Sequence, residues 1–294
     1  MYRDFWNEEY NRCKNGLTVN GYTITGFNYY FLNYYQLPNT EQEKAGDSRS
    51  IIFPKFFVYQ YEFFHYFELC RVLRKNYALM KNRGCGASEI NASIFDNFFN
   101  CFKNSICLLT AFDGNYVNKT LDKIWNGISF TDDNTGGGML KLRQVINTNT
   151  KKRSTYYKVV NGQKIETGFG SQIEGIIVDK DRKMRGDRVS FLFLEESGSN
   201  PILEKSFIKA EELVTVGGNK TGVIGAVGTG GDEGAALAGL NKVYYNPTDF
   251  LILPFHHNYT DTGEWVNTGY FMPAYITMNK SGYVGSRGEY LINK

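Results

Sequence analysis

The segment Lys81–Ser88 has the composition of a loop that binds phosphate. It consists of Lys81, Asn82, Arg83, Gly84, Cys85, Gly86, Ala87 and Ser88. Two glycines let the backbone curl around an anion, and the N–H groups at the start of a helix carry partial positive charge. Because the segment lies between an apolar run and a helical pattern, it predicts a phosphate-binding loop between a strand and a helix. An ordinary turn between those elements is the alternative.

The charged and hydroxyl groups of this segment predict how it would hold a nucleotide. Lys81 and Arg83 would contact the phosphates, and Ser88 would place its hydroxyl on Mg²⁺. The usual phosphate loop has a lysine directly before that serine, but this chain has Ala87 there. The positive charge is therefore expected from the front of the loop, from Lys81 or from Arg83.

Two adjacent carboxylates, Glu195 and Glu196, follow the apolar run Val189–Leu194. A buried strand that ends in two acids is the Walker B arrangement, in which the first acid holds the water shell of Mg²⁺ and the second polarises the attacking water. Successive strand residues point to opposite faces of a sheet, so the two acids can have different tasks. A pair of solvated acids at a strand end is the alternative.

A third apolar run, Thr221–Val227, leads into the glycine-rich sequence Gly228-Thr229-Gly230-Gly231. Thr229 would sense the γ-phosphate beside the Walker B acids, whereas a flexible turn is the alternative. All three segments follow apolar runs, and ligands of open α/β sheets bind at the carboxyl ends of the strands. Together the three segments predict a nucleoside triphosphatase.

The elements that would position these residues alternate between helices and strands. Helical spacing of apolar residues predicts helices over Pro54–Arg74, Glu89–Lys103 and Tyr116–Trp125. The first helix would bury Phe57, Tyr61, Phe64, His65, Leu69 and Val72. Short apolar runs predict strands at Tyr77–Met80, Ser105–Ala111, Glu174–Asp179, Val189–Leu194, Thr221–Val227 and Phe250–Phe255. Apolar strands separated by helices predict an α/β fold with a mostly parallel central sheet flanked by helices.

Two regions stand apart from this alternation. Residues 1–50 form an aromatic-rich lead-in segment, in which Glu8–Cys13 predicts a short helix and Gly21–Leu37 predicts one or two strands. Residues 131–170 predict a β-rich insertion, because Asn161-Gly162 between two β-forming runs is a hairpin signal.

The insertion also contains the candidate surface for DNA. The candidates are Lys151, Lys152, Arg153 and Lys158, with Tyr156 and Tyr157 between them, near the predicted hairpin. Basic residues interleaved with aromatic residues suit contacts with the nucleic-acid backbone that do not read sequence. A solvated charged surface is the alternative.

The composition excludes several classes of protein. Of the 294 residues, 42% are hydrophobic and 16% are aromatic, which is too apolar for a disordered chain. Five cysteines without a Cys-x-x-Cys pair, with three histidines, favour neither a disulfide framework nor a zinc site. No apolar run approaches the ~18 residues of a membrane span. Because the N-terminus also lacks the apolar core of a signal peptide, we expect a cytoplasmic protein without membrane contact.

The order of these segments resembles that of the ATPase domain of the bacteriophage terminase large subunit, the DNA-packaging motor. Gly21–Asn33 looks like the G-x-x-I-T-G-x-x-Y-x-x-L-N segment of that family, and Met184–Arg188 resembles the basic element before its Walker B acids. Glu195 stands where the family usually has aspartate, one methylene shorter, so the metal would sit differently or be held through water. The resemblance covers roughly residues 5–260 and implies a P-loop NTPase fold of the ASCE type that hydrolyses ATP with Mg²⁺.

The resemblance also implies roles for single residues. Lys81 occupies the displaced position of the Walker A lysine in that family, and Thr229 and Gly230 match its coupling motif. Arg185 would stabilise the charge of the transition state, either in its own site or in a neighbour's. Gln60, about twenty residues before the loop, would read the edge of the adenine.

By this resemblance, residues 51–270 are the P-loop ATPase domain and residues 271–294 are a linker toward a nuclease domain that the sequence lacks. Only three acidic residues follow Phe255, so we expect no nuclease activity and a nuclease that was cut off or lies on another chain. The implied partners in the host cytoplasm are double-stranded DNA, the portal protein and the small terminase subunit. On the portal the chain would form a homo-oligomeric ring, and in isolation a monomer.

Two other functions stay open at this point. A helicase-like DNA translocase would share the nucleotide site, but it should carry a second motor domain. A nucleotide-binding structural module without turnover is supported by Ala87 at the position of the usual lysine.

Overall fold

The computed structural model describes residues 2–38, 51–135, 146–178, 188–229 and 235–274. The chain divides into two compact units, which are described separately. The first comprises Met1–Phe57, Ser88–Cys107 and Asn118–Glu174, and the second comprises Val58–Ala87, Leu108–Val117 and Gly175–Lys294. None of the described helices is long and apolar enough to cross a membrane.

The central sheet follows the predicted α/β pattern. Its strands are β5 (Tyr77–Lys81), β6 (Ile106–Ala111), β7 (Ile146–Asn147), β8 (Lys151–Val160), β9 (Gln163–Ile177), β10 (Phe191–Leu194), β13 (Val223–Thr229) and β16 (Tyr270–Met272). They lie in the order β16-β5-β13-β10-β6-β9-β8-β7. The pairs β16–β5, β5–β13 and β13–β10 are parallel, whereas β9–β8 and β8–β7 are antiparallel. The mostly parallel sheet and the β-rich insertion are thus both confirmed.

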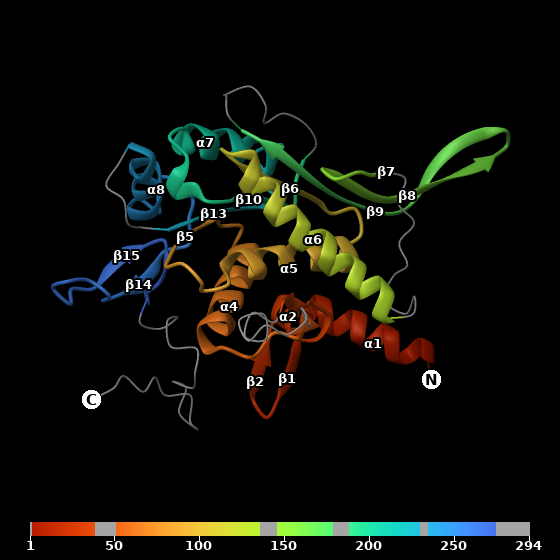
Figure 1. Cartoon of the computed structure of the whole chain (residues 1–294), viewed down its shortest axis with the longest axis horizontal. Helices are drawn as coiled ribbons and strands as arrows, with labels where there is room; N and C mark the ends of the chain where they lie inside the picture. The colour runs from red at the N-terminus through yellow and green to blue at the C-terminus, as the bar shows by residue number, and fades with distance from the viewer. Residues whose placement is uncertain (1, 39–50, 136–145, 179–187, 230–234, 275–294) are drawn as a thin grey trace, which may run out of the picture. The chain divides into compact units, whose positions relative to one another are not determined.

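In the second unit, helices cover both faces of the parallel strands. On one face α4 (Val58–Leu73) packs Phe63 and Phe67 against Tyr77, with ring centroids 5.5 and 5.9 Å apart. The helices α7 (Leu203–Leu213) and α8 (Ala235–Tyr245) lie on the other side of these strands (Figure 1). The unit also contains η1 (Ser197–Ser199), β11 (Thr215–Val216), β12 (Asn219–Lys220), β14 (Phe255–His257) and β15 (Val266–Thr268).

The predicted buried face of α4 was wrong in part. Leu69 and Val72 are 52% and 62% exposed, whereas Phe63 and Phe67 are fully buried. Apolar residues occur all around this helix, so their spacing does not select one face. The buried face of α4 is the one whose Phe63 and Phe67 rings pack against aromatic rings of the sheet, such as Tyr77.

The strand predicted at Phe250–Phe255 is also wrong. Of this run, only Ile252 forms a bridge, with Asn76, and strand β14 begins at Phe255. The Asn76 side chain donates to the carbonyl of Phe250 at 2.8 Å and accepts from the N–H of Ile224 at 3.0 Å. Because Asn76 is fully buried, these bonds hold residues 250–252 as a turn next to the start of β5. The strand that pairs with the free side of β5 is β16, which the sequence did not reveal.

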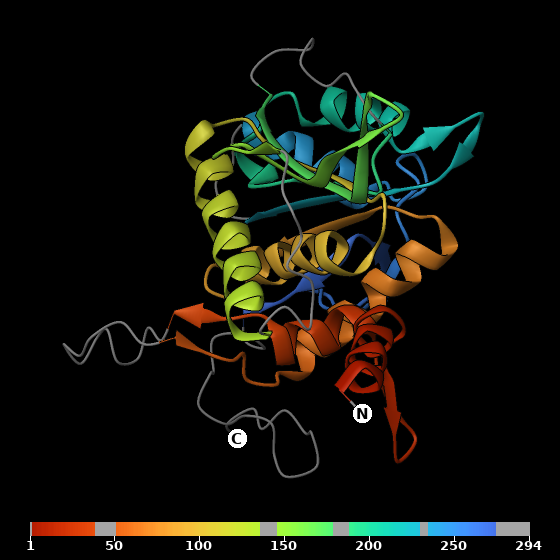
Figure 2. The same ribbon diagram turned by 90° about the vertical axis from the view of Figure 1, so that its right-hand side faces the viewer.

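The first unit is mostly helical. It contains α1 (Tyr2–Asn15), β1 (Leu17–Val19), β2 (Tyr22–Ile24), α2 (Gly26–Tyr34), β3 (Leu37–Pro38), β4 (Ile51–Ile52) and most of α5 (Ala87–Cys101) and α6 (Gly114–Thr135). Figure 2 shows α1 and α2 (red) side by side. The β8–β9 hairpin belongs to this unit as far as Glu174, and its turn is the predicted Asn161-Gly162. The run predicted as a separate strand at Glu174–Asp179 is the end of β9, and Asp179 lies outside the described residues.

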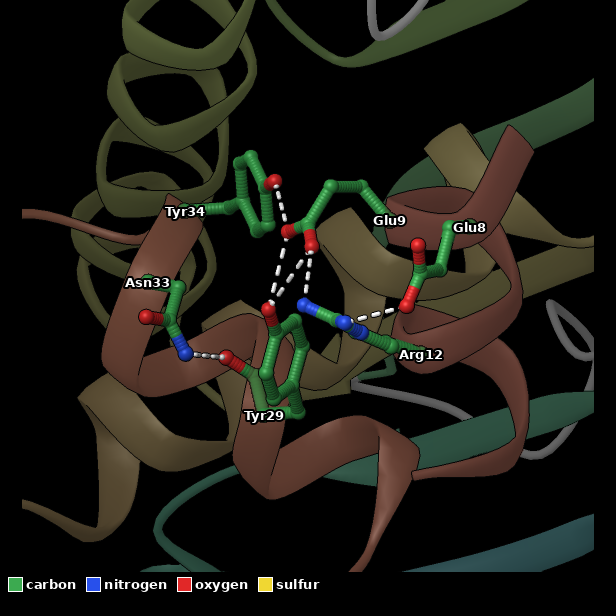
Figure 3. A network of polar contacts seen from close by, with 6 residues as sticks. All are labelled: Glu8, Glu9, Arg12, Tyr29, Asn33 and Tyr34. Atoms are coloured by element: carbon green, nitrogen blue, oxygen red, sulfur yellow. Dashed lines mark hydrogen bonds and ion pairs between the residues drawn. The ribbon is translucent and has the colours of Figure 1, made fainter. Parts of the chain in front are cut away.

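Residues 26–34 form a helix, although we expected strands there. The Thr25 hydroxyl caps the helix by accepting from the N–H of Asn28. Tyr29 and Tyr34 of this helix donate their hydroxyls to the carboxylate of Glu9 on α1, at 2.8 and 2.5 Å (Figure 3). Arg12 adds an ion pair to the same carboxylate at 2.7 Å. The aromatic residues have high strand propensity, but these tertiary contacts favour a helix.

Asp96 on α5 is the least satisfied polar group of this unit. Its side chain is fully buried, and neither carboxyl oxygen has a hydrogen-bond partner among the described residues. One oxygen packs directly on α6, since a Cβ added to Gly127 would lie 1.8 Å from it. Burial, together with the nearby charge of Glu89, raises the pKa of Asp96 well above its usual value.

We predict that Asp96 makes the stability of this fold depend on pH. The folded state holds its proton at pH values where the unfolded state has released it, so the free energy of unfolding falls as pH rises above about 4. Within that window one such group contributes roughly 1.4 kcal/mol per pH unit. Denaturant titrations of wild type and Asp96→Asn between pH 4 and pH 8 should give a difference that grows with pH.

Asp122→Asn, which removes an exposed carboxylate from α6, is the matched control and should run parallel to wild type. If the Asp96→Asn curve is also parallel to wild type, Asp96 is not a buried neutral acid.

Candidate active site

The segment predicted to bind phosphate lies between β5 and α5. Lys81 is the last residue of β5, and α5 begins at Ala87, so Ser88 stands in its first turn. The residues between them include Gly84 and Gly86, with φ angles of +80° and +82°. Left-handed residues next to a helix N-terminus turn backbone N–H groups toward one point, which is how proteins cradle anions. Arg83 is exposed on this loop, whereas Cys85 is buried.

Two buried side chains of α4, Tyr59 and Gln60, contact the backbone of this loop. Tyr59 donates its hydroxyl to the carbonyl of Cys85 at 3.1 Å, and the Gln60 amide lies 3.5 Å from the same oxygen. The two side chains also lie 3.4 Å from each other. A Cβ added to Gly86 would lie 3.2 Å from the Gln60 nitrogen, so the amide packs directly on the loop. The structure thus places Gln60 against Cys85 and Gly86 of this loop.

Three of the predicted residues meet at the carboxyl ends of the parallel strands. Lys81 and Thr229 are paired in the register of β5 and β13. The Lys81 ammonium donates to the Thr229 hydroxyl at 3.0 Å and lies 3.8 Å from a carboxylate oxygen of Glu196. The side chains of Lys81 and Glu196 are only 12% and 21% exposed. Lysine, threonine and carboxylate from three different segments therefore form one polar cluster, which we call the strand-end cluster.

The chain turns sharply after β10 to bring Glu196 into this cluster. Glu196 has φ +44° and ψ +49°, a left-handed conformation that is uncommon for glutamate. The next residues form η1, whose Gly198 lies against β13. A Cβ added to Gly198 would be 2.8 Å from the Thr229 carbonyl, so a larger residue there would push η1 off β13. Glu195 is buried, and its N–H donates to the Thr110 carbonyl on β6 at 2.8 Å.

The donor types of the site fit a nucleotide and its metal. Glu195 offers a carboxylate, one of the hard oxygen ligands that Mg²⁺ prefers, and the other predicted ligand, Ser88, belongs to the first unit. Lys81 offers the cation that phosphate oxygens need, and Glu196 offers a carboxylate for a water molecule. Arg185 and Gly230 lie outside the described residues.

Of the three consecutive basic residues predicted to contact DNA, two are ion-paired within the first unit, and the third has uncharged partners. Lys151 forms an ion pair with Glu174 at 2.8 Å, and Arg153 forms one with Glu166 at 3.1 Å. Lys152 donates to the Asn147 side chain at 2.6 Å, and its ammonium lies 5.1 Å from the centre of the Trp125 ring.

Sequence reasoning missed two features that shape the site. The helical pattern over Pro54–Arg74 gives no sign that the Tyr59 hydroxyl reaches a loop 26 residues later in the chain. Gly198 was not singled out either. The sequence Glu196-Ser197-Gly198-Ser199, in which a glycine follows the acids within two residues, was the available signal.

The fold is that of a phage terminase ATPase domain. A point variant of the large terminase ATPase domain of Thermus phage P74-26 matches with a TM-score of 0.50 and 10% identity, covering 70% of this chain and 80% of that chain. Another structure of that domain gives a TM-score of 0.40 at 14% identity, over 50% of this chain and 58% of the other. The large terminase of bacteriophage HK97 gives 0.46 at 11% identity, over 71% of this chain and 40% of the other.

At such low identity the likeness establishes the fold and leaves the activity to the site residues. No protein-family profile matches this chain, and no curated protein sequence matches it.

We predict that Tyr59 keeps the phosphate loop ordered. Tyr59→Phe removes the hydroxyl bonded to the Cys85 carbonyl, while the Gln60 amide remains 3.5 Å from the same oxygen, so we expect a cost of about 0.5–1.5 kcal/mol. Hydrogen exchange measured by mass spectrometry should then rise in peptides that cover residues 82–87. Tyr22→Phe, at a tyrosine that is 76% exposed, should leave both exchange and stability unchanged. Unchanged exchange in the Tyr59→Phe loop would show that this bond does not order it.

Proposed function

We propose that the chain is the ATPase motor domain of a phage terminase large subunit. It would hydrolyse ATP and use the energy to move double-stranded DNA into a procapsid. The observation that carries this proposal is the strand-end cluster, in which Lys81, Thr229 and Glu196 meet at the end of the strand that leads into the glycine loop. The strand order supports it, because β13 lies between the loop strand β5 and the acidic strand β10.

Each residue has a role that follows from its chemistry. Bound Mg²⁺ would neutralise negative charge on the β- and γ-phosphates, and Ser88 and Glu195 are the residues that would hold it. Backbone N–H groups of residues 83–88 and the Lys81 ammonium would bind the phosphates. Glu196 would accept a hydrogen bond from the attacking water and orient it. Gln60, beside the loop, would contact the base.

Thr229 would link the nucleotide to motion. Its hydroxyl shares the Lys81 ammonium with Glu196, and its backbone carbonyl touches η1 through the gap left by Gly198. A change at Lys81 therefore reaches both β13 and the turn after β10. In a ring on the portal, with the small subunit and DNA as further partners, Arg185 would act in its own site or in a neighbour's.

A nucleotide-binding module without turnover is the second candidate, because Ala87 occupies the usual lysine position and is buried at the start of α5. The measurement that separates the two is the rate of phosphate release from ATP by the wild-type chain, with and without DNA and portal. Turnover under any of these conditions excludes the inert module.

We predict that Glu196→Gln keeps ATP binding and loses turnover. Amide and carboxylate have similar shape, so the phosphate contacts remain, but the water is no longer activated. Loss of such a group typically costs ~10²–10⁴-fold in rate. The measurements are steady-state phosphate release and the dissociation constant of a fluorescent ATP analogue.

Glu204→Gln is the matched control, because it removes the same charge from a surface ion pair with Lys242. It should behave as wild type. Turnover by Glu196→Gln within a few-fold of wild type would mean that another group orients the water.

We predict that Lys81 matters more than Arg83. Lys81 already points into the strand-end cluster, whereas Arg83 is exposed on the loop. Lys81→Ala should abolish hydrolysis and weaken binding of the ATP analogue, and Arg83→Ala should weaken binding less. If Arg83→Ala carries the whole loss, then the arginine replaces the lysine. If neither variant differs from wild type, the loop is not the phosphate site.

A further inference from the structure

The outer half of the β8–β9 hairpin is a two-stranded ribbon that does not belong to the core. We call residues 156–167 the arm. Its two strands pair in regular register from Tyr156 opposite Thr167 to Val160 opposite Gln163. Every residue from Tyr157 to Glu166 is exposed, and Val159 reaches 74%. In Figure 1 these ends of β8 and β9 form a twisted ribbon drawn beyond β7.

A bulge, a close backbone contact and a buried hydrogen bond fix the base of the arm. The pairing of β8 and β9 shifts between Arg153 and Thr155, which marks a bulge. Opposite the bulge, Gly168 has φ +133°, and a Cβ there would lie 2.9 Å from the Thr155 Cα. Just below it, the Ser154 and Ser171 hydroxyls are 2.6 Å apart and buried. The arm thus leaves the sheet in a direction fixed by backbone geometry.

Each face of the arm carries one lysine over one tyrosine. The register places Tyr157 and Lys164 on one face, with the ammonium 4.2 Å from the ring centre. It places Tyr156 and Lys158 on the other face, with the ammonium 5.5 Å from the ring centre. These cation–π contacts orient both lysines without neutralising them.

Among the residues that the structure describes, the arm carries two lysines without an acidic partner. Within the described part of the chain, neither Lys158 nor Lys164 has a carboxylate in ion-pair range. The one acid of the arm, Glu166, faces the base, where it accepts from Thr155 at 2.6 Å and pairs with Arg153. Lys151 is paired with Glu174 in the same way. Lys158 and Lys164 are therefore the uncompensated cations of the exposed arm, whereas Lys152 at the base contacts Asn147 and the Trp125 ring.

We infer that the arm is a contact surface for duplex DNA, with Lys158 and Lys164 on phosphates. A two-stranded ribbon fits the major groove, which is about 12 Å wide. Lysines on both faces of such a ribbon can reach the backbones on both sides of the groove, and the amides of Asn161 and Gln163 lie at its tip. The choice of duplex DNA as the partner rests on the proposed function. The positive charge of Lys158 and Lys164 favours DNA over a protein as the partner of the arm.

The test is the salt dependence of DNA binding. The wild-type chain and Lys158→Gln/Lys164→Gln are titrated against a fluorescent 30-base-pair duplex of arbitrary sequence, by anisotropy, between 50 and 200 mM NaCl. Each phosphate contact contributes about 0.9 to the slope of log K against log salt, so the double variant should lose roughly 2 units of slope. Its affinity at 50 mM NaCl should fall at least several-fold, with an unchanged thermal melting curve.

Lys151→Gln/Arg153→Gln is the matched control, since it removes two cations from the base of the same hairpin that are ion-paired with Glu174 and Glu166. It should keep the wild-type slope. The inference is overturned if the two variants lose equal slope, if the arm variant keeps the wild-type slope, or if the wild-type chain does not bind the duplex. ATP hydrolysis is measured on the same samples with and without DNA and portal. Absence of hydrolysis under all these conditions, with an intact arm effect, would contradict the proposed function and leave the arm as a DNA contact.

Discussion

A largely buried lysine that needs oxygen partners organises the edge of the parallel sheet. The Lys81 ammonium, with its side chain only 12% exposed, has little access to water and is held by the Thr229 hydroxyl and the Glu196 carboxylate. Burying a cation is unfavourable unless such partners are present. Their presence requires β13 to lie beside β5, β10 to lie beside β13, and the chain to turn left-handed at Glu196.

These requirements explain features that otherwise look unrelated. Gly198 has no side chain because η1 must lie against the Thr229 carbonyl to bring Glu196 inward. Tyr59 and Gln60 hold the Cys85 carbonyl, so the loop that follows Lys81 keeps one shape. Under the proposed function, phosphate oxygens would compete with Thr229 and Glu196 for the same ammonium. A bound nucleotide would then change the contacts of Thr229 on β13 and of Glu196, the acid proposed to orient water, at the same time.

The residues that carry chemistry were easier to predict than the packing around them. Glycines, adjacent acids and a lysine at strand ends reflect local chemistry, and the structure brings Lys81, Thr229 and Glu196 together as the three segments suggested. The helix at residues 26–34 was missed because it is stabilised by hydrogen bonds to Glu9, which lies twenty residues before Tyr29 in the sequence. The turn at Phe250 was missed because it depends on the buried Asn76. The strand β16 has only three residues, Tyr270–Met272, and gives no periodic signal.

The central claim is that a nucleotide binds at the strand-end cluster. The most direct measurement is a structure of the chain with a non-hydrolysable ATP analogue and Mg²⁺. We predict that the phosphates lie against residues 82–88, that the Lys81 ammonium has turned from Glu196 to a phosphate oxygen, and that Glu196 faces the γ-phosphate. A nucleotide bound elsewhere, or phosphates at this loop with the Lys81–Glu196 and Lys81–Thr229 contacts unchanged, would contradict it.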